Sequence, residues 1–266
     1  MASLHNVAYS QELRRTSTAQ AIITGIYDDL IDEWDSSPER IKTILFSDKF
    51  ESNNVLELLC RQYFDIIKYG VNQKLFYEVV PALIMAQEKS KEQFNPNICE
   101  DDVIKITKEK GGYAMLFYRS SISHPCSTDE YNFYYTLGGL LQMTNDINDA
   151  YKDYLSGTKT LMHLGWPITK IEKVFKDQIN QVNLKWESWQ GHRSRKNFSF
   201  FTRINVITSR SLVTLNEYKY QFDYTEANTS FDINKIPKNK LIKGIGIPWK
   251  LFSWYSYWSN LQNKGV

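Results

Sequence analysis

Hydrophobic residues recur every three or four positions along most of the chain, which is the spacing that places them on one face of an α-helix. The pattern is clearest at 53–71, where an apolar stripe follows Asn53 and Asn54, either of which can cap a helix. No alternation of apolar and polar residues is sustained enough to predict a β-sheet. The same spacing predicts further helices at 18–34, 73–94, 99–122, 127–155, 168–190 and 197–222. We therefore expect an all-α fold.

Proline and glycine modify these predictions. Pro81 should kink or break the helix expected at 73–94, because a proline inside a helix has no amide hydrogen to donate. Gly111 and Gly112 should divide the segment 99–122 into two helical pieces.

The remaining segments contain no obvious linker and no internal repeat. Residues 223–240 are polar and irregular, and an aromatic segment at 247–262 closes the chain. We therefore expect residues 1–266 to form a single helical domain. The C-terminal residues 244–266 are expected to pack against the bundle, to cap a cavity or to contact a membrane surface, as mixed Trp, Tyr and Lys segments do.

Composition narrows the function classes. The 266 residues are 42% hydrophobic, enough for a full core, and the formal net charge is only +2 with no long basic block, so nucleic acid is not an expected partner. The three cysteines match no zinc pattern, and no stretch resembles a signal peptide or a membrane span. These features predict a soluble, cytoplasmic protein, with peripheral membrane contact through residues 244–266 left open. Monomer and homodimer both remain open.

Carboxylates recur at helical spacing within two apolar segments. Asn145, Asp149 and Asp153 are four residues apart, so a helix would place them in one line about 12 Å long. In the earlier segment Asp28 and Asp32 are also four apart. Like charges at this spacing destabilise an isolated helix by tenths of a kcal/mol, roughly.

One interpretation is that both rows are solvated helix faces. The other is a divalent-metal site, because hard oxygen ligands without a neighbouring cation are what Mg²⁺ requires, and two acidic helices that face each other need cations between them.

Both acidic segments resemble known motifs. DDLID, residues 28–32, resembles the DDxxD motif of class I isoprenoid synthases. LGGLLQMTNDINDAYKD, residues 137–153, resembles the second acidic motif of the squalene and phytoene synthase family, and Gln142 and Asn145 occupy matching positions. The same stretch is similar to the metal-binding triad of terpene cyclases. The resemblance implies a single-domain helical bundle with a central apolar cavity.

The resemblance also implies an enzyme that ionises an allylic prenyl diphosphate, releases pyrophosphate and then cyclises or eliminates. Its cofactor would be Mg²⁺, in three ions bound together with the diphosphate. The implied metal ligands are Asp28, Asp29, Asp32, Asn145, Asp149 and Asp153, with Asp29 in a supporting position. The implied substrate-binding residues are Gln142, Lys159, Arg119, Tyr113 and Phe117, with Lys108 and Lys110 as further basic candidates.

The chain departs from the squalene and phytoene synthase pattern at its arginines. That family carries one shortly before the first motif, where this chain has Thr24 to Tyr27, and one before the second-motif aspartate, where this chain has Asn148. Fewer basic contacts favour a reaction with a single diphosphate. The alternatives are head-to-head or head-to-tail prenyl transfer, a non-catalytic relative that binds isoprenoid, and a helical interaction module with surface carboxylates.

Overall fold

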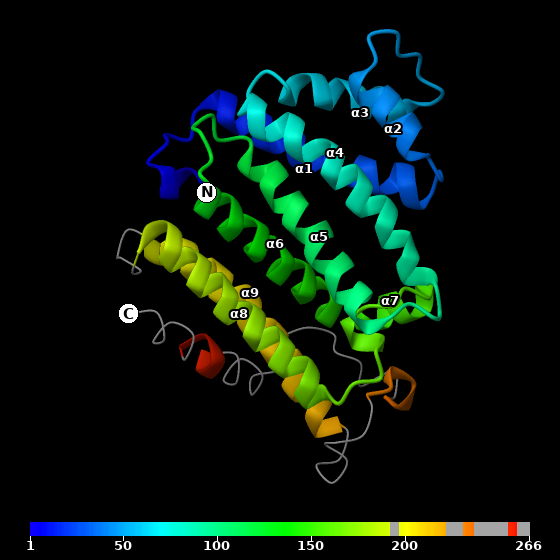
Figure 1. The fold of residues 1–266 in the computed structure, drawn as a ribbon, viewed down its shortest axis with the longest axis vertical. Coiled ribbons are helices and arrows are strands. Elements are labelled where there is room, and N and C mark those ends of the chain that lie inside the picture. The colour runs from blue at the N-terminus through cyan, green and yellow to red at the C-terminus, as the bar shows by residue number, and fades with distance from the viewer. Residues whose placement is uncertain (192–196, 222–230, 237–254, 260–266) are drawn as a thin grey trace.

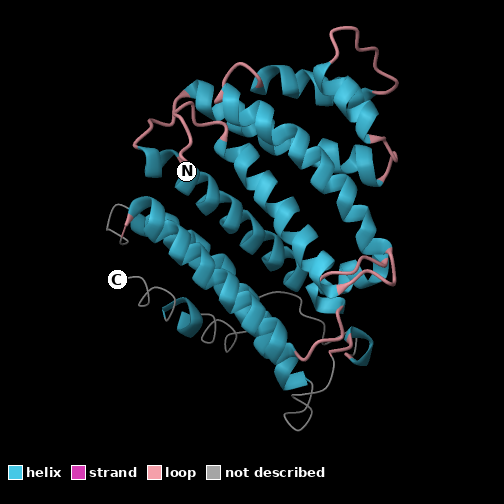
Figure 2. Ribbon diagram, in the orientation of Figure 1, coloured by secondary structure: helices cyan, strands magenta, loops and turns pink. Residues whose placement is uncertain are grey.

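The computed structural model describes residues 1–191, 197–221, 231–236 and 255–259. Helices joined by loops and turns make up this part of the chain, and it contains no β-strand (Figure 2). The prediction of an all-α fold is therefore confirmed. Most of the aromatic segment 244–266 lies outside the described residues, so its role stays a prediction.

The described helices follow one another with short connections. In chain order the α-helices are α1 (Gln11–Asp32), α2 (Pro38–Phe46), α3 (Val55–Ile67), α4 (Gln73–Ser90), α5 (Glu100–Arg119), α6 (Thr128–Asn148), α7 (Ala150–Ser156), α8 (Ile168–Gln190) and α9 (Phe198–Gln221). Short 3₁₀ turns are η1 (Ala2–His5), η2 (Lys91–Phe94), η3 (Leu161–His163) and η6 (Ile233–Lys235).

Helices α5 and α6 form the centre of the bundle and pack against each other along their length (Figure 1). On one side α4 packs against α5, and α1 packs against α3. On the other side α8 and α9 both pack against α6. The large side chains that are fully buried come from both sides, as Phe76 on α4 and Phe175 on α8 illustrate. The two central helices thus separate two groups of peripheral helices.

Helix starts depend on polar caps that the hydrophobic pattern does not contain. α1 begins at Gln11, seven residues before the predicted start, because the Ser10 hydroxyl accepts a hydrogen bond from the Leu13 amide. α2 was not predicted. It begins with Pro38 directly after its cap, Ser37, and proline is favoured at the first helical position because its missing amide hydrogen is not needed there.

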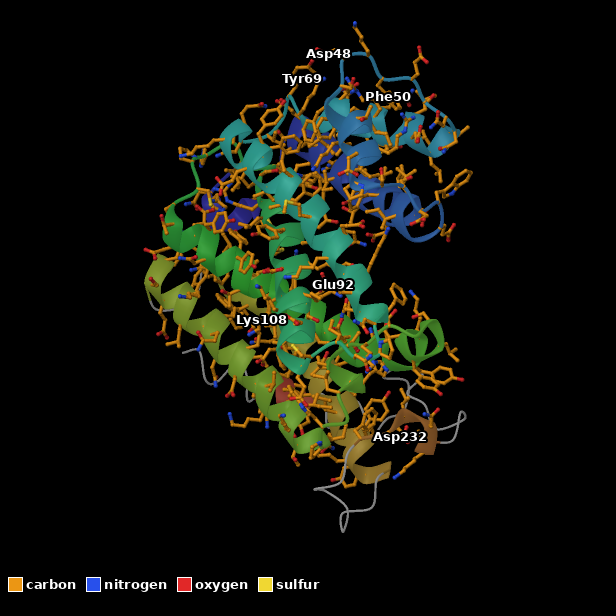
Figure 3. The ribbon with its side chains drawn as sticks, turned by 45° about the vertical axis from the view of Figure 1, so that its right-hand side comes forward. Asp48, Phe50, Tyr69, Glu92, Lys108 and Asp232 are labelled. Atoms are coloured by element: carbon orange, nitrogen blue, oxygen red, sulfur yellow. The ribbon has the colours of Figure 1, made fainter. Side chains whose placement is uncertain are left out.

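The loop between α2 and α3 is held by charged side chains. Phe50 lies under the guanidinium groups of Arg40 and Arg61, at 5.6 Å and 6.0 Å from its ring centre (Figure 3). Arg40 also donates to both carboxylate oxygens of Glu57 and to the backbone carbonyl of Glu51. These contacts fix one end of the bundle.

The breaks predicted at Pro81 and at Gly111–Gly112 do not occur. α4 continues through Pro81, and its neighbours Val80 and Ile84 are buried, so packing compensates for the lost backbone hydrogen bond. α5 is also continuous. Its glycines serve the contact with α6: a Cβ atom on Gly111 would overlap the carbonyl oxygen of Gly138, and one on Gly138 would overlap that of Gly111.

Within the described residues, no helix is both long enough and apolar enough to cross a lipid bilayer.

The contact between α5 and α6 can be tested by one alanine substitution. Gly138→Ala should lower the free energy of unfolding by about 1–3 kcal/mol, because the new methyl group needs space that the α5 backbone occupies. Gly25→Ala on α1 is the matched control, since a Cβ there meets no atom within 4 Å. That variant should gain about 0.5–1 kcal/mol from helix propensity. Urea denaturation measures both values, and equal effects at the two positions would contradict the close contact.

Candidate functional site

A cavity of about 440 Å³ lies between α1, α4, α5 and α6, with further contributions from α2, α3 and α9. Pockets for small organic molecules measure about 300–1,000 Å³, so this cavity is of that size. Most of its wall is apolar. The apolar side chains are Ile23, Tyr27, Leu45, Phe64, Val80, Leu83, Ile84, Ala114, Met115, Phe117, Leu141 and Ile207.

The direction of the helices determines which residues lie level with each other around the cavity. The Thr107 hydroxyl on α5 donates to Asp146 on α6, and Lys89 on α4 forms a salt bridge with Glu109 on α5. Because α5 runs antiparallel to α4 and α6, the first half of α5 lies beside the last turns of the other two. The opposite end is marked by the backbone bond from the Asn72 amide to the Ser120 carbonyl, which joins the start of α4 to the end of α5.

The charged and carboxamide side chains that line the cavity gather where α1, α4 and α6 approach their C-terminal ends. They are Asp28 on α1, Gln87 on α4, Lys110 on α5, and Gln142 and Asn145 on α6. We call this group the polar end. Three carboxamides, one carboxylate and one ammonium group therefore face a mostly apolar cavity from four helices. The structure thus brings one residue of the first acidic motif together with two of the second.

The second acidic motif spans a turn rather than one continuous helix. α6 ends at Asn148, Asp149 has φ −98° and ψ 11°, and α7 begins at Ala150. The prediction of one helix over 127–155 is wrong at this point. The backbone bonds from Asp149 to Asn145 and from Asp153 to Asp149 are nevertheless kept, at 2.8 Å and 2.9 Å, so the four-residue register of the motif survives the turn.

Asn148 holds this turn against α9. Its amide nitrogen donates to the Ser211 hydroxyl at 3.0 Å and to the Thr144 carbonyl, and its amide oxygen accepts from the Thr214 hydroxyl at 3.1 Å. The turn is held from the other side by His163, whose Nε2 lies 2.9 Å from the Ala150 carbonyl oxygen. Asn148, at the position where the squalene and phytoene synthase pattern has arginine, thus connects two helices in this chain.

Asp146 is a member of the site that the sequence analysis did not assign. It is buried, and it accepts hydrogen bonds from the Thr107 hydroxyl at 3.0 Å and from the Gln142 amide at 3.1 Å. Burial raises the pKa of Asp146 to about 6, although these two hydrogen bonds act in the opposite direction. The contact orients Gln142, which itself lines the cavity. The only signal in the sequence was a carboxylate between the buried residues Met143 and Ile147.

The carboxyl group of Asp153 interacts electrostatically with the carboxylates of Asp146 and Asp149. Burial is the largest cause that raises the pKa of Asp153 to about 7, and the carboxylates of Asp146 and Asp149 add to it. Lys110 and Lys152 lower the pKa only in part. The three aspartates and Lys110 are thus close enough to interact, and the cluster carries an excess of negative charge.

The first acidic motif is divided between the cavity and the surface. Asp28 lines the cavity, whereas the side chain of Asp29 is exposed and does not line it. The side chain of Asp32 lies outside the described residues, so its assignment as a ligand stays a prediction. Asp35, just beyond the helix, pairs with Lys91 at 3.2 Å and joins the end of α1 to the end of α4.

The basic residue that lines the cavity is Lys110 rather than Lys159. The ammonium of Lys159 contacts the Pro96 carbonyl, and its backbone exchanges hydrogen bonds with Gln93, so it belongs to the loop beside η2. Lys108 packs its side chain over Gly139 on α6, away from the cavity (Figure 3). Among the described residues, Lys110 is the cation that lines this cavity.

The placement of Arg119 contradicts the prediction that it binds substrate. It is fully buried at the far end of α5, where it pairs with Glu130 and donates to the carbonyl oxygens of Ile122 and His124. These partners occupy the guanidinium group, and Arg119 does not line the cavity. Its role is to join the C-terminal end of α5 to the start of α6, so it is not a candidate for substrate binding.

Of the two aromatic residues predicted to bind substrate, Phe117 lines the cavity and Tyr113 does not. Phe117 lines the cavity opposite the polar end, and its ring packs 6.1 Å from that of Phe76. Tyr113 instead packs edge-on against Tyr135, with ring centres 5.3 Å apart, and does not line the cavity. Phe117 therefore keeps its assignment to the cavity wall.

The chemistry of the donors fits a divalent cation. Within the described side chains no three His, Cys, Asp or Glu residues form a preassembled metal site. Burial and the neighbouring carboxylates both raise the pKa of Asp153, and Mg²⁺ accepts carboxylate and amide oxygens as ligands while it keeps water and phosphate ligands. Asp28, Asn145, Asp149 and Asp153 are the residues that would hold it.

The structural role of Arg119 generates a stability prediction. Arg119→Met should cost about 3–5 kcal/mol of unfolding free energy, because Glu130 is left buried without its guanidinium partner. The double variant Arg119→Met/Glu130→Leu should be markedly less destabilised than the sum of its single variants. Urea denaturation of the four proteins measures this coupling. Full stability of Arg119→Met would contradict the buried ion pair.

Comparison with known proteins gives no match: a scan against protein-family models, a search of curated proteins and a search of solved structures each find none.

Proposed function

We propose that this chain is a Mg²⁺-dependent isoprenoid synthase that ionises an allylic prenyl diphosphate and releases pyrophosphate, followed by cyclisation or elimination. The observation that supports it is the shared cavity: Asp28 of the first acidic motif and Gln142 and Asn145 of the second line one apolar chamber together with Lys110. A polar, charged end and an apolar remainder match a substrate with a diphosphate head and a hydrocarbon tail.

In this proposal the diphosphate lies at the polar end. Bound Mg²⁺ would supply the positive charge that stabilises the leaving diphosphate. The ammonium of Lys110 donates to a diphosphate oxygen as a compact charge. Asp28, Asn145, Asp149 and Asp153 would hold the Mg²⁺, and of these Asp28 and Asn145 line the cavity, while the Asp146 carboxylate keeps the Gln142 amide in place.

In this proposal the apolar wall of the cavity surrounds the carbocation that forms when the diphosphate leaves. The carbon–oxygen bond breaks heterolytically, so the electron pair leaves with the diphosphate and the hydrocarbon is left as a cation. Side chains such as Leu83, Met115 and Leu141 exclude water, which would otherwise capture that cation. The rings of Tyr27 and Phe117 offer electron-rich faces to it.

Charge also favours one diphosphate over two. Within the described residues a single lysine lines the cavity, and no arginine does. Coupling of two prenyl diphosphates would bring a second polyanion to the same polar end. We therefore place cyclisation or elimination ahead of head-to-head or head-to-tail prenyl transfer.

Turnover tests the proposal directly. Purified protein with Mg²⁺ and allylic diphosphates of ten, fifteen and twenty carbons should release pyrophosphate and hydrocarbon. Asp149→Ala should reduce pyrophosphate release by about 100-fold or more, because it removes one of the groups that stabilise the leaving charge. Asp177→Ala, a surface carboxylate on α8, is the control and should leave the rate unchanged. Absence of pyrophosphate release from the unmodified protein would overturn the proposed reaction, and binding without turnover would favour a non-catalytic isoprenoid-binding protein.

Two neighbouring lysines provide a matched test of the polar end. Lys110→Ala should weaken binding of inorganic pyrophosphate in the presence of Mg²⁺ by about tenfold or more, because a charge-assisted contact is lost. Lys108→Ala should change it less than about twofold, since Lys108 lies on the α6 side of the helix. Isothermal titration calorimetry measures both. Equal losses would contradict the orientation of α5.

A further inference from the structure

Helix α7 carries Asp153 of the second acidic motif and lies at one end of the bundle (Figure 1). It has seven residues, and the side chain of Asp149, at its N-cap position, makes no capping hydrogen bond within the described residues. An isolated helix of this length is marginal in water, so contacts with other elements determine where α7 lies. Asp149 is exposed and Asp153 is half-buried. The positions of these two carboxylates therefore depend on contacts that other residues make with the turn.

Asn148 supplies the contact with α9. Its two amide hydrogens go to the Thr144 carbonyl and to the Ser211 hydroxyl, and its amide oxygen accepts from the Thr214 hydroxyl. Both donors of the carboxamide are thus used, which fixes its orientation. Ser211 and Thr214 are buried, so the loss of one of these bonds leaves a polar group without its partner in the protein interior. Helix α9 therefore constrains the residue that directly precedes Asp149.

His163 on η3 supplies the contact with the other side of the turn. The Thr160 amide donates to Nδ1 of His163 at 3.2 Å, so Nδ1 is an acceptor and the proton of the neutral ring is on Nε2. Nε2 then donates to the Ala150 carbonyl at 2.9 Å. Burial lowers the pKa of His163, which favours the neutral ring that these bonds require. The imidazole therefore connects η3 to the first residue of α7.

The loop that leads into η3 is itself attached to the end of α4. The Lys159 amide donates to the Gln93 carbonyl at 2.8 Å, and the Gln93 side-chain amide donates to the Lys159 carbonyl at 2.9 Å. Gln93 lies on η2, directly after α4, and both Gln93 and Thr160 are buried. His163 therefore contacts α7 from an element with a fixed position.

We propose that the turn of the second acidic motif has two supports, and that these supports hold Asp149 and Asp153 where they bind Mg²⁺ together with diphosphate. The first support is Asn148 with its partners Ser211 and Thr214, and the second is His163. The proposed function supplies the identity of the ligand, and this inference rests on it in that respect.

The four residues of the two supports are positioning residues. Within the described structure none of their side chains lines the cavity, so they act through the backbone of the turn. Groups that orient metal-binding side chains typically change metal affinity by about 10–100-fold when they are removed, so each support should have a measurable effect.

Two threonines on α9 provide a matched test of the first support. Thr214→Val replaces the hydroxyl that Asn148 needs by a methyl group of similar size. It should weaken the binding of inorganic pyrophosphate in the presence of Mg²⁺ by about tenfold, measured by isothermal titration calorimetry. Thr208 is equally buried, but its hydroxyl donates to carbonyl oxygens of α9 itself. Thr208→Val should therefore change the affinity less than about twofold, because the contacts of the turn stay intact.

Two substitutions of His163 test the second support. Glutamine places its side-chain nitrogen near the position of Nε2 and can still donate to the Ala150 carbonyl, whereas asparagine is one methylene shorter and does not reach it. His163→Gln should keep the pyrophosphate affinity within about threefold of the unmodified protein, and His163→Asn should lower it by about tenfold. Equal affinities of the two variants would contradict the role of the bond to α7.

Hydrogen exchange measures the turn without metal or ligand. In the unmodified protein the amides of Asp149 and Asp153 donate to backbone carbonyls across the turn. Mass spectrometry of peptides from residues 145–157 should show these amides exchanging at least about fivefold faster in Thr214→Val and in His163→Asn, because local opening of the turn becomes easier. Thr208→Val should show the exchange rates of the unmodified protein.

The two measurements separate this inference from the proposed function. Faster exchange in the two variants, together with no binding of pyrophosphate by the unmodified protein, would overturn the proposed function and leave the support of the turn standing. Binding by the unmodified protein with unchanged affinity in every variant, or with equal losses in Thr214→Val and Thr208→Val, would overturn the inference and leave the proposed function standing.

Discussion

The backbone contact between α5 and α6 is the constraint on which the rest of the structure depends. A Cβ atom on either Gly111 or Gly138 would overlap the backbone of the opposite helix, and one on Gly112 would overlap the ring of Tyr135. Because glycine has no side chain, the two helices approach until their backbones touch. This closeness places Lys110 and Gln142, neighbours of the contact, on the wall of one cavity. It also lets Thr107 reach Asp146 across the interface.

The same contact explains how negative charge is tolerated inside the bundle. Asp146 is buried because α5 covers α6 at this level, and its charge is met by two hydrogen bonds and by the nearby Lys110. The turn at Asp149 leaves Asp149 exposed and Asp153 half-buried, and burial, followed by the charges of Asp146 and Asp149, raises the pKa of Asp153. The buried Asp146 positions an amide, whereas the half-buried Asp153 accepts no hydrogen bond from Gln142 or Thr107, so the two aspartates have different surroundings although their sequence context is similar.

The charged residues at the two ends of the central helices have different surroundings. At the end of α5 that is remote from the acidic motifs, Arg119 and Glu130 form a buried pair, and His5 of the N-terminal turn reaches the same carboxylate at 3.2 Å. At the other end the charged residues line an open cavity or lie near it. Both ends carry arginine or lysine together with carboxylates, so composition alone does not separate them. Burial on all sides makes the first a structural element, and access to a cavity makes the second a candidate site.

The sequence by itself determined the helical class, the positions of most helices and the register of the acidic motifs, because helical periodicity and four-residue spacing are local properties of the chain. It did not reveal that Gly111 and Gly112 continue a helix, since a glycine that breaks an isolated helix is the same residue that permits close packing of two. It also favoured Lys159 and Arg119 over Lys110 as basic residues of the site, because the direction of each side chain depends on the neighbouring helix and not on the local sequence. Tertiary structure decided that Lys110 and Phe117 line the cavity and that Arg119 is buried with Glu130.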